Sequence, residues 1–335
     1  MTTRRDFLRT SSALALGGLL VPRLTTAADW LNAPLAARPV GIQLFTLFGP
    51  MNDDPKGTLE QVAKVGYQEI ESAFSLRGGY YGYSAKEFKA LVESLGMHWR
   101  AHHAMGAPFR PRPEGPRPDG PRPEATPPAG TTSAAGAAPA ARPRMDFSKM
   151  PPMLTLRDNY QQLVDQAAEG GLTYLVCAST PVSTKEEIDK SIEVFRKTGE
   201  ACKKAGIQFA YHNHATEFDP VADAGGKTPY ELILSQTDKD LVKMELDLAW
   251  ATKAGKDPVA LFKEHPGRFP LLHVKDIKAD RQTITEVGNG VVDFKRIFAA
   301  ANIAGMKYFF VEQDMAPNGI ADVRTSFDNL KKIQA

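Results

Sequence analysis

Short hydrophobic runs alternate with longer amphipathic stretches along most of this chain. The short runs are rich in β-branched and aromatic residues, which favours strands. Stretches such as 58–65 and 187–195 repeat apolar residues at the spacing of an amphipathic helix. Several helical stretches end at a glycine typical of helix C-termini, namely Gly66, Gly96, Gly206 and Gly305. The predicted strands cover residues 40–45, 68–72, 98–103, 173–178, 207–212, 242–247, 270–275 and 307–312.

Eight strands separated by helices predict an α/β fold with a parallel sheet, and this number suits a closed (βα)8 TIM barrel. A doubly wound open sheet is the alternative. However, no Gly-x-Gly-x-x-Gly motif follows the first strand, so the dinucleotide-binding form has little support. We therefore assign residues 38–335 to one barrel domain.

One segment, residues 107–143, interrupts this rhythm after the third predicted strand. It contains a proline- and arginine-rich stretch followed by alanine, glycine, threonine and proline. It has almost no apolar side chains to bury and too many prolines for a helix or sheet, so we expect a disordered insertion. Without it the barrel keeps 261 residues, near the roughly 250 typical of the fold. A neutral linker is the simplest interpretation; a tether or partner-binding arm is the alternative.

The N-terminus, residues 1–28, has the features of a twin-arginine (Tat) export signal. Arg4 and Arg5 precede Phe7 and Leu8, an apolar run follows over 13–21, and the segment ends in small residues. The apolar run is too short to span a bilayer comfortably. We expect a periplasmic, exported protein; a chance arginine pair before a Sec signal, or a retained anchor, is the alternative.

The composition is that of a globular protein, with 42% hydrophobic and 24% charged residues among 335. The formal charge of +2 becomes −1 once residues 1–28 are removed. Such a balance gives no electrostatic reason to expect nucleic acid or an anionic membrane as partner. The two cysteines, Cys177 and Cys202, are expected to be buried free thiols rather than a disulfide.

Polar side chains stand at the ends of the last four predicted strands, where a core would be apolar. Because side chains alternate along a strand, residues two positions apart share a face, and in a barrel one face points inward. The residues concerned are His212 and His214, Glu245 and Asp247, His273 and Lys275, and Glu312.

Four of these residues, one from each strand end, predict a metal site: His212, Asp247, His273 and Glu312. Two imidazoles and two carboxylates suit one divalent ion, with Mn²⁺, Zn²⁺, Fe²⁺ and Co²⁺ not distinguished, and leave coordination positions for substrate or water. A single histidine is more simply a polar residue with a partner. Four such groups at successive strand ends are harder to explain as packing, since burying them unpaired is costly.

The chain resembles the sugar phosphate isomerase/epimerase family of xylose-isomerase-like barrels, in the branch with a Tyr-His-Asn-His element. The resemblance runs from Gly41 to the C-terminus apart from the insertion. Its markers include Gly41-Ile-Gln-Leu-Phe-Thr, Tyr211-His-Asn-His, His273-Val-Lys-Asp276, Gly288-Asn-Gly290 and Val311-Glu312.

This resemblance implies a metal that holds a hydroxy-ketone and stabilises an enediolate while a carboxylate moves a proton. Asp247, His273 and Glu312 match the family's ligands, and Glu312 is the expected general base. The chain departs from the two-glutamate epimerases at the fifth strand, where His212 replaces a metal-binding glutamate. A metal-bound neutral histidine is a poor second proton shuttle, so elimination competes with epimerisation.

The remaining candidates stand nearby. His214 and Lys275 are candidate catalytic residues that could replace the missing shuttle; a salt bridge is the alternative for Lys275. We expect Glu217 to orient a histidine of the fifth strand. Substrate binding is expected of Glu71, His102, Glu245 and Trp250, with support of the metal ligands as the alternative for Glu71 and His102, and a core position as the alternative for Trp250.

The leading functional hypothesis is a metal-dependent isomerase or epimerase of a sugar or keto-sugar. A lyase or dehydratase of 3-keto-glycosides or keto-inositols is the second, and a non-catalytic sugar-binding barrel the third. A metal-dependent endonuclease is disfavoured by the near-neutral charge and the export signal. We expect a small-molecule sugar as partner, without nucleic acid or a stable membrane partner; homo-oligomerisation is left open.

Overall fold

The structure is a computed structural model that describes residues 37–108 and 153–335. Eight parallel strands close into a barrel, which confirms the predicted (βα)8 TIM barrel. Each strand ends within two residues of its prediction. The strands are β1 (Gly41–Gln43), β2 (Glu69–Ser72), β3 (His98–Met105), β4 (Tyr174–Ser179), β5 (Gln208–His212), β6 (Val242–Asp247), β7 (Leu271–Val274) and β10 (Tyr308–Val311).

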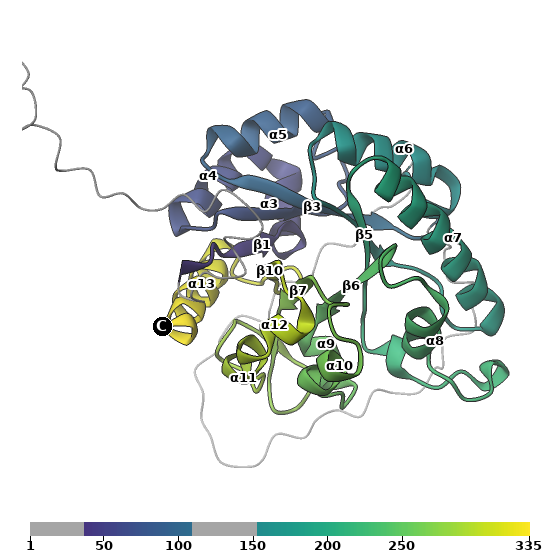
Figure 1. Cartoon of the computed structure of the whole chain (residues 1–335). Helices are drawn as coiled ribbons and strands as arrows, with labels where there is room; N and C mark the ends of the chain where they lie inside the picture. Colours follow the sequence, from purple (N-terminus) through teal and green to yellow (C-terminus); the bar gives the residue numbers. More distant parts are fainter. Residues whose placement is uncertain (1–36, 109–152) are drawn as a thin grey trace, which may run out of the picture.

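The strand order is β1-β10-β7-β6-β5-β4-β3-β2, so β10 closes the barrel against β1 (Figure 1). The register places Asp247 beside His273, and Phe310 beside His273 on the other side. All eight strands run in one direction, so their carboxyl ends meet at one rim. A separate antiparallel pair, β8 (Asp276–Ile277) and β9 (Ile284–Thr285), follows β7.

Helices surround the strands (Figure 1). The four glycines predicted to end helices, Gly66, Gly96, Gly206 and Gly305, all have φ between 75° and 119°, a left-handed conformation that favours glycine. The helices are α3 (Phe48–Asp53), α4 (Pro55–Val65), α5 (Ala85–Ser94), α6 (Leu156–Glu169), α7 (Lys185–Lys204), α8 (Pro229–Gln236), α9 (Leu248–Lys253), α10 (Pro258–Glu264), α11 (Phe294–Ala299), α12 (Ala301–Ala304) and α13 (Ile320–Gln334).

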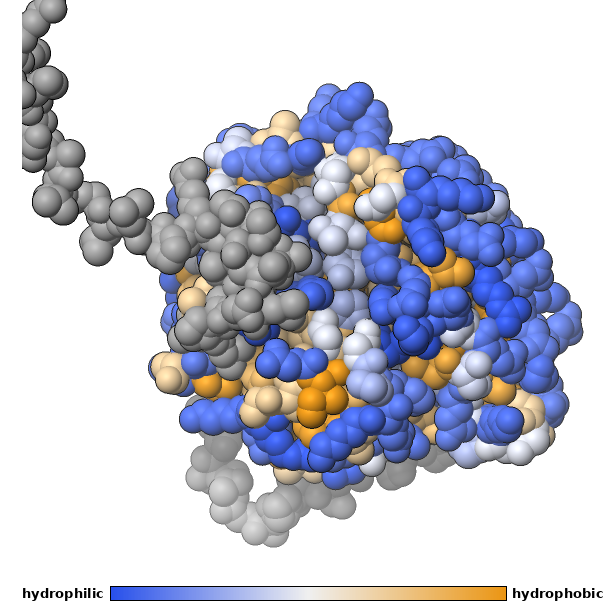
Figure 2. Space-filling model, in the orientation of Figure 1, coloured by the Kyte–Doolittle hydropathy of each residue, from blue (hydrophilic) through white to orange (hydrophobic). Residues whose placement is uncertain are grey.

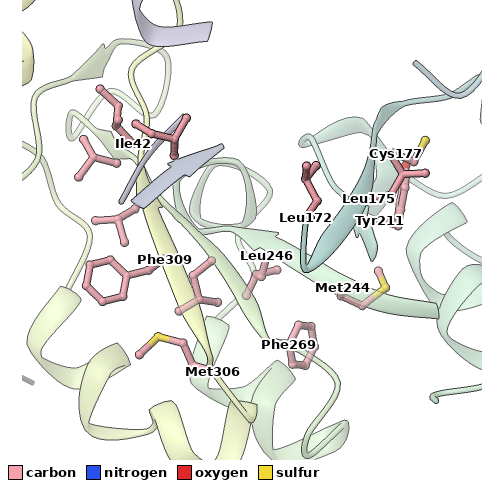
Figure 3. Packing of buried hydrophobic residues seen from close by; sticks show 14 of the residues in the cluster. Ile42, Leu172, Leu175, Cys177, Tyr211, Met244, Leu246, Phe269, Met306 and Phe309 are labelled. Atoms are coloured by element: carbon pink, nitrogen blue, oxygen red, sulfur yellow. The ribbon is translucent and has the colours of Figure 1, made fainter. Parts of the chain in front are cut away.

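The hydrophobic core has two layers. A large layer packs between strands and helices, and Figure 3 shows part of it, with Met244, Leu246 and Phe309 on the strands. A smaller cluster, which includes Ala101, Leu271 and Phe310, fills the barrel interior. Because Met244 and Leu246 face the helices, Glu245 and Asp247 face the interior, as strand alternation predicts. The interior is therefore apolar at one end and polar at the rim where the strands end.

The face seen in Figure 2 is largely hydrophilic, with apolar side chains in small groups. Within residues 37–108 and 153–335, no helix is long and apolar enough to cross a membrane. Cys177 and Cys202 are both buried free thiols, as expected. The predicted export signal (1–28) and the insertion beyond residue 108 lie outside the described residues.

Candidate metal centre

Four polar residues from four adjacent strands converge at the carboxyl ends of the barrel strands. His212 and Asp247 are the last residues of β5 and β6, His273 lies on β7, and Glu312 directly follows β10. All four are buried, and one potential ligand atom from each lies within 4.8 Å of the others. The structure thus brings together the complete predicted ligand set.

The convergent atoms lack hydrogen-bond partners. They are Nε2 of His212, Oδ2 of Asp247, Nδ1 of His273 and Oε2 of Glu312. Nδ1 of His212 donates to the carbonyl oxygen of Ala178 at 3.2 Å, so the lone pair of Nε2 faces the other three groups. The other contacts of these four atoms are ion pairs: Lys275 lies beside the two carboxylate oxygens, and Nδ1 of His273 lies 2.7 Å from Oε2 of Glu312. Nε2 of His212 has no hydrogen-bond partner, which is costly for a buried polar atom. A divalent cation would be bound by all four atoms, and this donor set fits such an ion.

A hydrogen-bonded layer beneath these atoms holds His273. Nε2 of His273 is hydrogen-bonded to Oε2 of Glu71 at 2.7 Å and lies 3.2 Å from Oε2 of Glu245. Gln43 donates to the same Glu71 oxygen at 3.0 Å. A carboxylate behind a ligating histidine fixes its tautomer and ring orientation. Glu71 and Glu245 are both fully buried, which favours support of the metal ligand over the substrate contact expected from the sequence.

His103 completes this layer and was missed in the sequence analysis. Its Nε2 is hydrogen-bonded to Oε2 of Glu245 at 2.7 Å, and its ring stacks on His273 with centroids 5.1 Å apart. His102 points the opposite way, with Nδ1 2.9 Å from Oγ of Ser72. Alternation counted from Ala101, which lies in the barrel interior, identifies His103 as the inward residue.

The supporting layer also has the composition of a metal site, since Glu71, His103, Glu245 and His273 offer atoms within 4.8 Å of one another. In this group, however, the histidine nitrogens are hydrogen-bonded to the carboxylates at 2.7 Å. In the upper group Nδ1 of His273 also lies 2.7 Å from Oε2 of Glu312, but Nε2 of His212 is 3.5 Å from Oδ2 of Asp247 and has no hydrogen-bond partner. The better candidate for the metal is therefore the set of His212, Asp247, His273 and Glu312.

Lys275 lies beside the ligand set. Its ammonium group is 2.9 Å from Oδ2 of Asp247 and 2.7 Å from Oε2 of Glu312, and it donates a hydrogen bond to Oδ1 of Asp314 at 3.0 Å. It also lies 5.1 Å from the ring centroid of Trp250. The structure thus places Lys275 in salt bridges, the alternative that the sequence left open, and Trp250 next to the site.

His214 stands above the ligands and is more accessible. Its side chain is 40% exposed, and its ring centroid lies 4.9 Å from that of His212. Oε1 of Glu217 lies 3.6 Å from Nδ1 of His214 and accepts a hydrogen bond from the hydroxyl of Tyr211. Oε2 accepts the backbone N–H of His214. Glu217 therefore orients His214, in keeping with its predicted role.

Several pKa values are shifted in this cluster. Burial alone would raise the pKa of Asp247 and Glu312, but the Lys275 ammonium group and neighbouring histidines hold both well below their usual values. Burial, with the Glu245 carboxylate, raises the pKa of Glu71. Burial and the nearby histidines lower the pKa of His212 to about 4, so this residue is a neutral ligand at physiological pH.

A recess of about 80 Å³ adjoins the supporting layer. Its walls come from the segment after β2, from β3 and from α6, and include Phe74, Tyr80, His102, His103 and Met105. Burial, together with His103, lowers the pKa of His102 to about 3, so His102 is a neutral hydrogen-bonding group in this wall. Its predicted contact with substrate stays a prediction.

The sequence model of a known family matches residues 59–333, and its description is "Xylose isomerase-like TIM barrel". The match covers more than half of the chain. The chain belongs to the xylose isomerase-like TIM barrel family. Proteins similar to this chain include an L-ribulose 3-epimerase and inosose dehydratases, so the family does not specify one reaction.

Among solved members, a sugar phosphate isomerase/epimerase from Parabacteroides distasonis ATCC 8503 is 26% identical, with a TM-score of 0.63, over 88% of this chain and 93% of that one. An IolI protein with a bound zinc atom shares the fold, with 16% identity and a TM-score of 0.57, over 88% of this chain and 99% of that one. An inosose dehydratase from Geobacillus thermodenitrificans is 27% identical over 158 residues, 41% of this chain and 51% of that protein. The chain spans about half the length of the curated relatives it matches.

Proposed function

We propose that this barrel is a divalent-metal-dependent enzyme that removes a proton from the carbon beside the carbonyl group of a sugar-like substrate. The observation that carries the proposal is the convergence of two imidazole nitrogens and two carboxylate oxygens, all from buried residues, within 4.8 Å of one another. The zinc in the IolI structure supports the class of metal, while Mn²⁺, Zn²⁺, Fe²⁺ and Co²⁺ all suit the donor set.

A bound metal ion supplies a Lewis acid that makes the carbon beside the carbonyl more acidic. His212 and His273 would hold the ion through Nε2 and Nδ1, and each ring is fixed from behind, by the carbonyl oxygen of Ala178 and by Glu71 respectively. Glu312 is the candidate base, because its carboxylate is ionised and belongs to the ligand cluster. His214 is the candidate acid, because it is accessible and backed by the Glu217 carboxylate.

The pairing of a carboxylate base, Glu312, with a histidine acid, His214, favours elimination over epimerisation. Epimerisation needs two comparable shuttles on opposite faces of the substrate, whereas the fifth strand offers the neutral ligand His212. In an elimination, Glu312 takes the proton, the electron pair of the C–H bond forms a C=C bond, and the bond to the β-hydroxyl breaks. His214 protonates that hydroxyl, which leaves as water. The similarity to inosose dehydratases supports this reaction.

The second candidate is the isomerase or epimerase that leads the sequence-based hypotheses. The likeness to the Parabacteroides sugar phosphate isomerase/epimerase, which extends over most of both chains, favours it. In this reaction Glu312 removes the same proton. A proton then returns to the substrate, and no hydroxyl group leaves.

The test is a reaction screen in D₂O with metal-loaded protein on keto-inositols, keto-sugars and 3-keto-glycosides. Elimination releases water or an aglycone, whereas isomerisation gives a product of the same formula with deuterium at one carbon. Glu312→Gln is expected to abolish turnover. Unchanged turnover by a folded Glu312→Gln variant would refute the proposed base, and no turnover by the wild type on any carbonyl substrate would count against the enzyme itself.

We further propose that residues 1–28 direct Tat-dependent export to the periplasm, which the twin arginines support. Fusion of these residues to a reporter that is active only when exported in the folded state tests this. Arg4→Lys with Arg5→Lys is expected to retain the reporter in the cytoplasm. Export that persists in this variant would argue for the Sec alternative.

A further inference from the structure

Lys275 brings a positive charge against the proposed ligands. Its side chain is 1% exposed, and its ammonium nitrogen lies within 3 Å of one oxygen each of Asp247 and Glu312. These are the same two oxygens, Oδ2 and Oε2, that belong to the convergent ligand atoms. Half of the proposed ligand set thus already faces a cation supplied by the chain.

A third carboxylate offers the same ammonium group another place. Asp314 accepts a well-formed hydrogen bond from Lys275 at 3.0 Å, and its side chain is 30% exposed, so this contact lies toward the solvent side of the ligand set. The ring of Trp250 lies 5.1 Å from the ammonium nitrogen and adds a favourable cation–π contact. Asp314 and Trp250 thus offer the ammonium group two contacts that do not involve the ligand oxygens.

We propose that Lys275 sets the metal affinity of this site: it pairs with Asp247 and Glu312 when no ion is bound, and metal binding drives it from these oxygens onto Asp314. The inference rests on the proposed metal centre. A divalent ion and an ammonium group compete for the same two oxygens, and they repel each other in a buried site. Metal binding must therefore break two ion pairs that stabilise the empty site.

The charges agree with such a competition. Asp247, Glu312 and Asp314 carry three negative charges and Lys275 one positive charge, so these four groups together carry −2. Without the lysine the three carboxylates would carry −3, and they would repel one another more strongly and attract a divalent ion more strongly. Both effects act in the same direction, so removal of the charge must tighten metal binding.

The test uses Lys275→Met, which keeps the length of the side chain and removes its charge. Competition titration of metal-free protein with Zn²⁺ and a chromophoric chelator is expected to show affinity about tenfold or more above the wild type. The metal-free variant is expected to melt at a lower temperature than the wild type, and to show a larger rise in Tm on metal addition.

Lys253→Met is the matched control. The ammonium group of Lys253 also lies 5.1 Å from the Trp250 ring, but among the described residues it forms no ion pair with a ligand carboxylate. Its removal should leave the metal affinity unchanged. Lys275→Arg keeps the charge and should stay near wild-type affinity. If Lys275→Met fails to fold, Lys275→Gln, which can still donate to Asp314, takes its place.

Equal or weaker metal binding by folded Lys275→Met or Lys275→Gln would overturn the inference. So would a gain of the same size in Lys275→Arg or Lys253→Met, since charge at this position would then not be the cause. Wild-type protein and Lys275 variants that all fail to bind Zn²⁺ would overturn the metal centre and, with it, this role of Lys275. If the wild type binds Zn²⁺ and Lys275→Met binds it equally well, the role of Lys275 is overturned but the metal centre is not.

Discussion

Replacement of Glu71 by glutamine tests whether the layer beneath the ligands serves the metal. The carboxylate accepts hydrogen bonds at its Oε2 from Gln43 and from Nε2 of His273. Glu71→Gln keeps the shape and removes one of the two carboxyl groups that lie behind the ligating histidine. Loss of such a partner typically weakens metal binding by about 10- to 100-fold.

The structure indicates the lower end of that range. Glutamine keeps one acceptor oxygen, and Oε2 of Glu245 remains 3.2 Å from Nε2 of His273. We therefore expect a metal Kd about tenfold higher, which corresponds to about 1.4 kcal/mol. Isothermal titration of metal-free protein with Zn²⁺ or Mn²⁺ measures it.

Glu69→Gln is the matched control, because Glu69 is a buried glutamate two residues earlier on the same strand. It pairs with Arg100 at 2.5 Å instead of with a ligand. Its replacement weakens the ion pair with Arg100, but it should leave the metal Kd unchanged. If Glu71→Gln binds metal as tightly as the wild type, or if Glu69→Gln weakens binding equally, the supporting role of Glu71 is refuted.

Three further outcomes follow from other parts of the structure. The pKa of His102 is about 3 in the folded state and about 6.5 in the unfolded state. Between pH 3 and pH 6.5 the unfolded state therefore binds more protons, and the protein loses stability as the pH falls through this range. His102→Asn should remove about 2 kcal/mol of the loss between pH 7.5 and pH 5 seen in denaturant unfolding; an unchanged pH dependence would contradict this. A Cβ at Gly290 would lie 2.2 Å from Oδ1 of Asp276, so Gly290→Ala should destabilise the folded protein by about 1–3 kcal/mol. Gly49→Ala, where a Cβ meets no other atom, should not destabilise it. Equal Tm values for the two variants would refute the steric argument. His214→Gln should lower turnover by about 10²- to 10⁴-fold without a change in metal Kd, and a loss of metal binding instead would make His214 a ligand.

The fold could be predicted from the sequence because local pattern and tertiary role agree along the chain. Each strand is a short apolar run between turn residues, and each long helix has one apolar face. Gly66 and Gly206 mark helix ends for a backbone reason that is visible in the sequence, since they adopt a left-handed conformation. The antiparallel pair β8 and β9 escaped prediction because each strand has only two residues.

The ligand set could be predicted because it lies at strand ends, where packing in an apolar core does not explain polar residues. The supporting layer was harder. A register irregularity between β2 and β3 falls at Ile70 and Glu71, and no local signal reveals which of His102 and His103 points inward. Burial of Glu71 and Glu245 beneath His273 depends on how four strands pack, so their supporting role emerges only from the closed barrel.

The most direct test of the account is anomalous diffraction from crystals of the protein soaked in Zn²⁺ or Mn²⁺. The account predicts one strong peak per chain among His212, Asp247, His273 and Glu312, with Nδ1 as the ligating nitrogen of His273. A peak between Glu71, His103, Glu245 and Nε2 of His273, or no peak at either group, would contradict it.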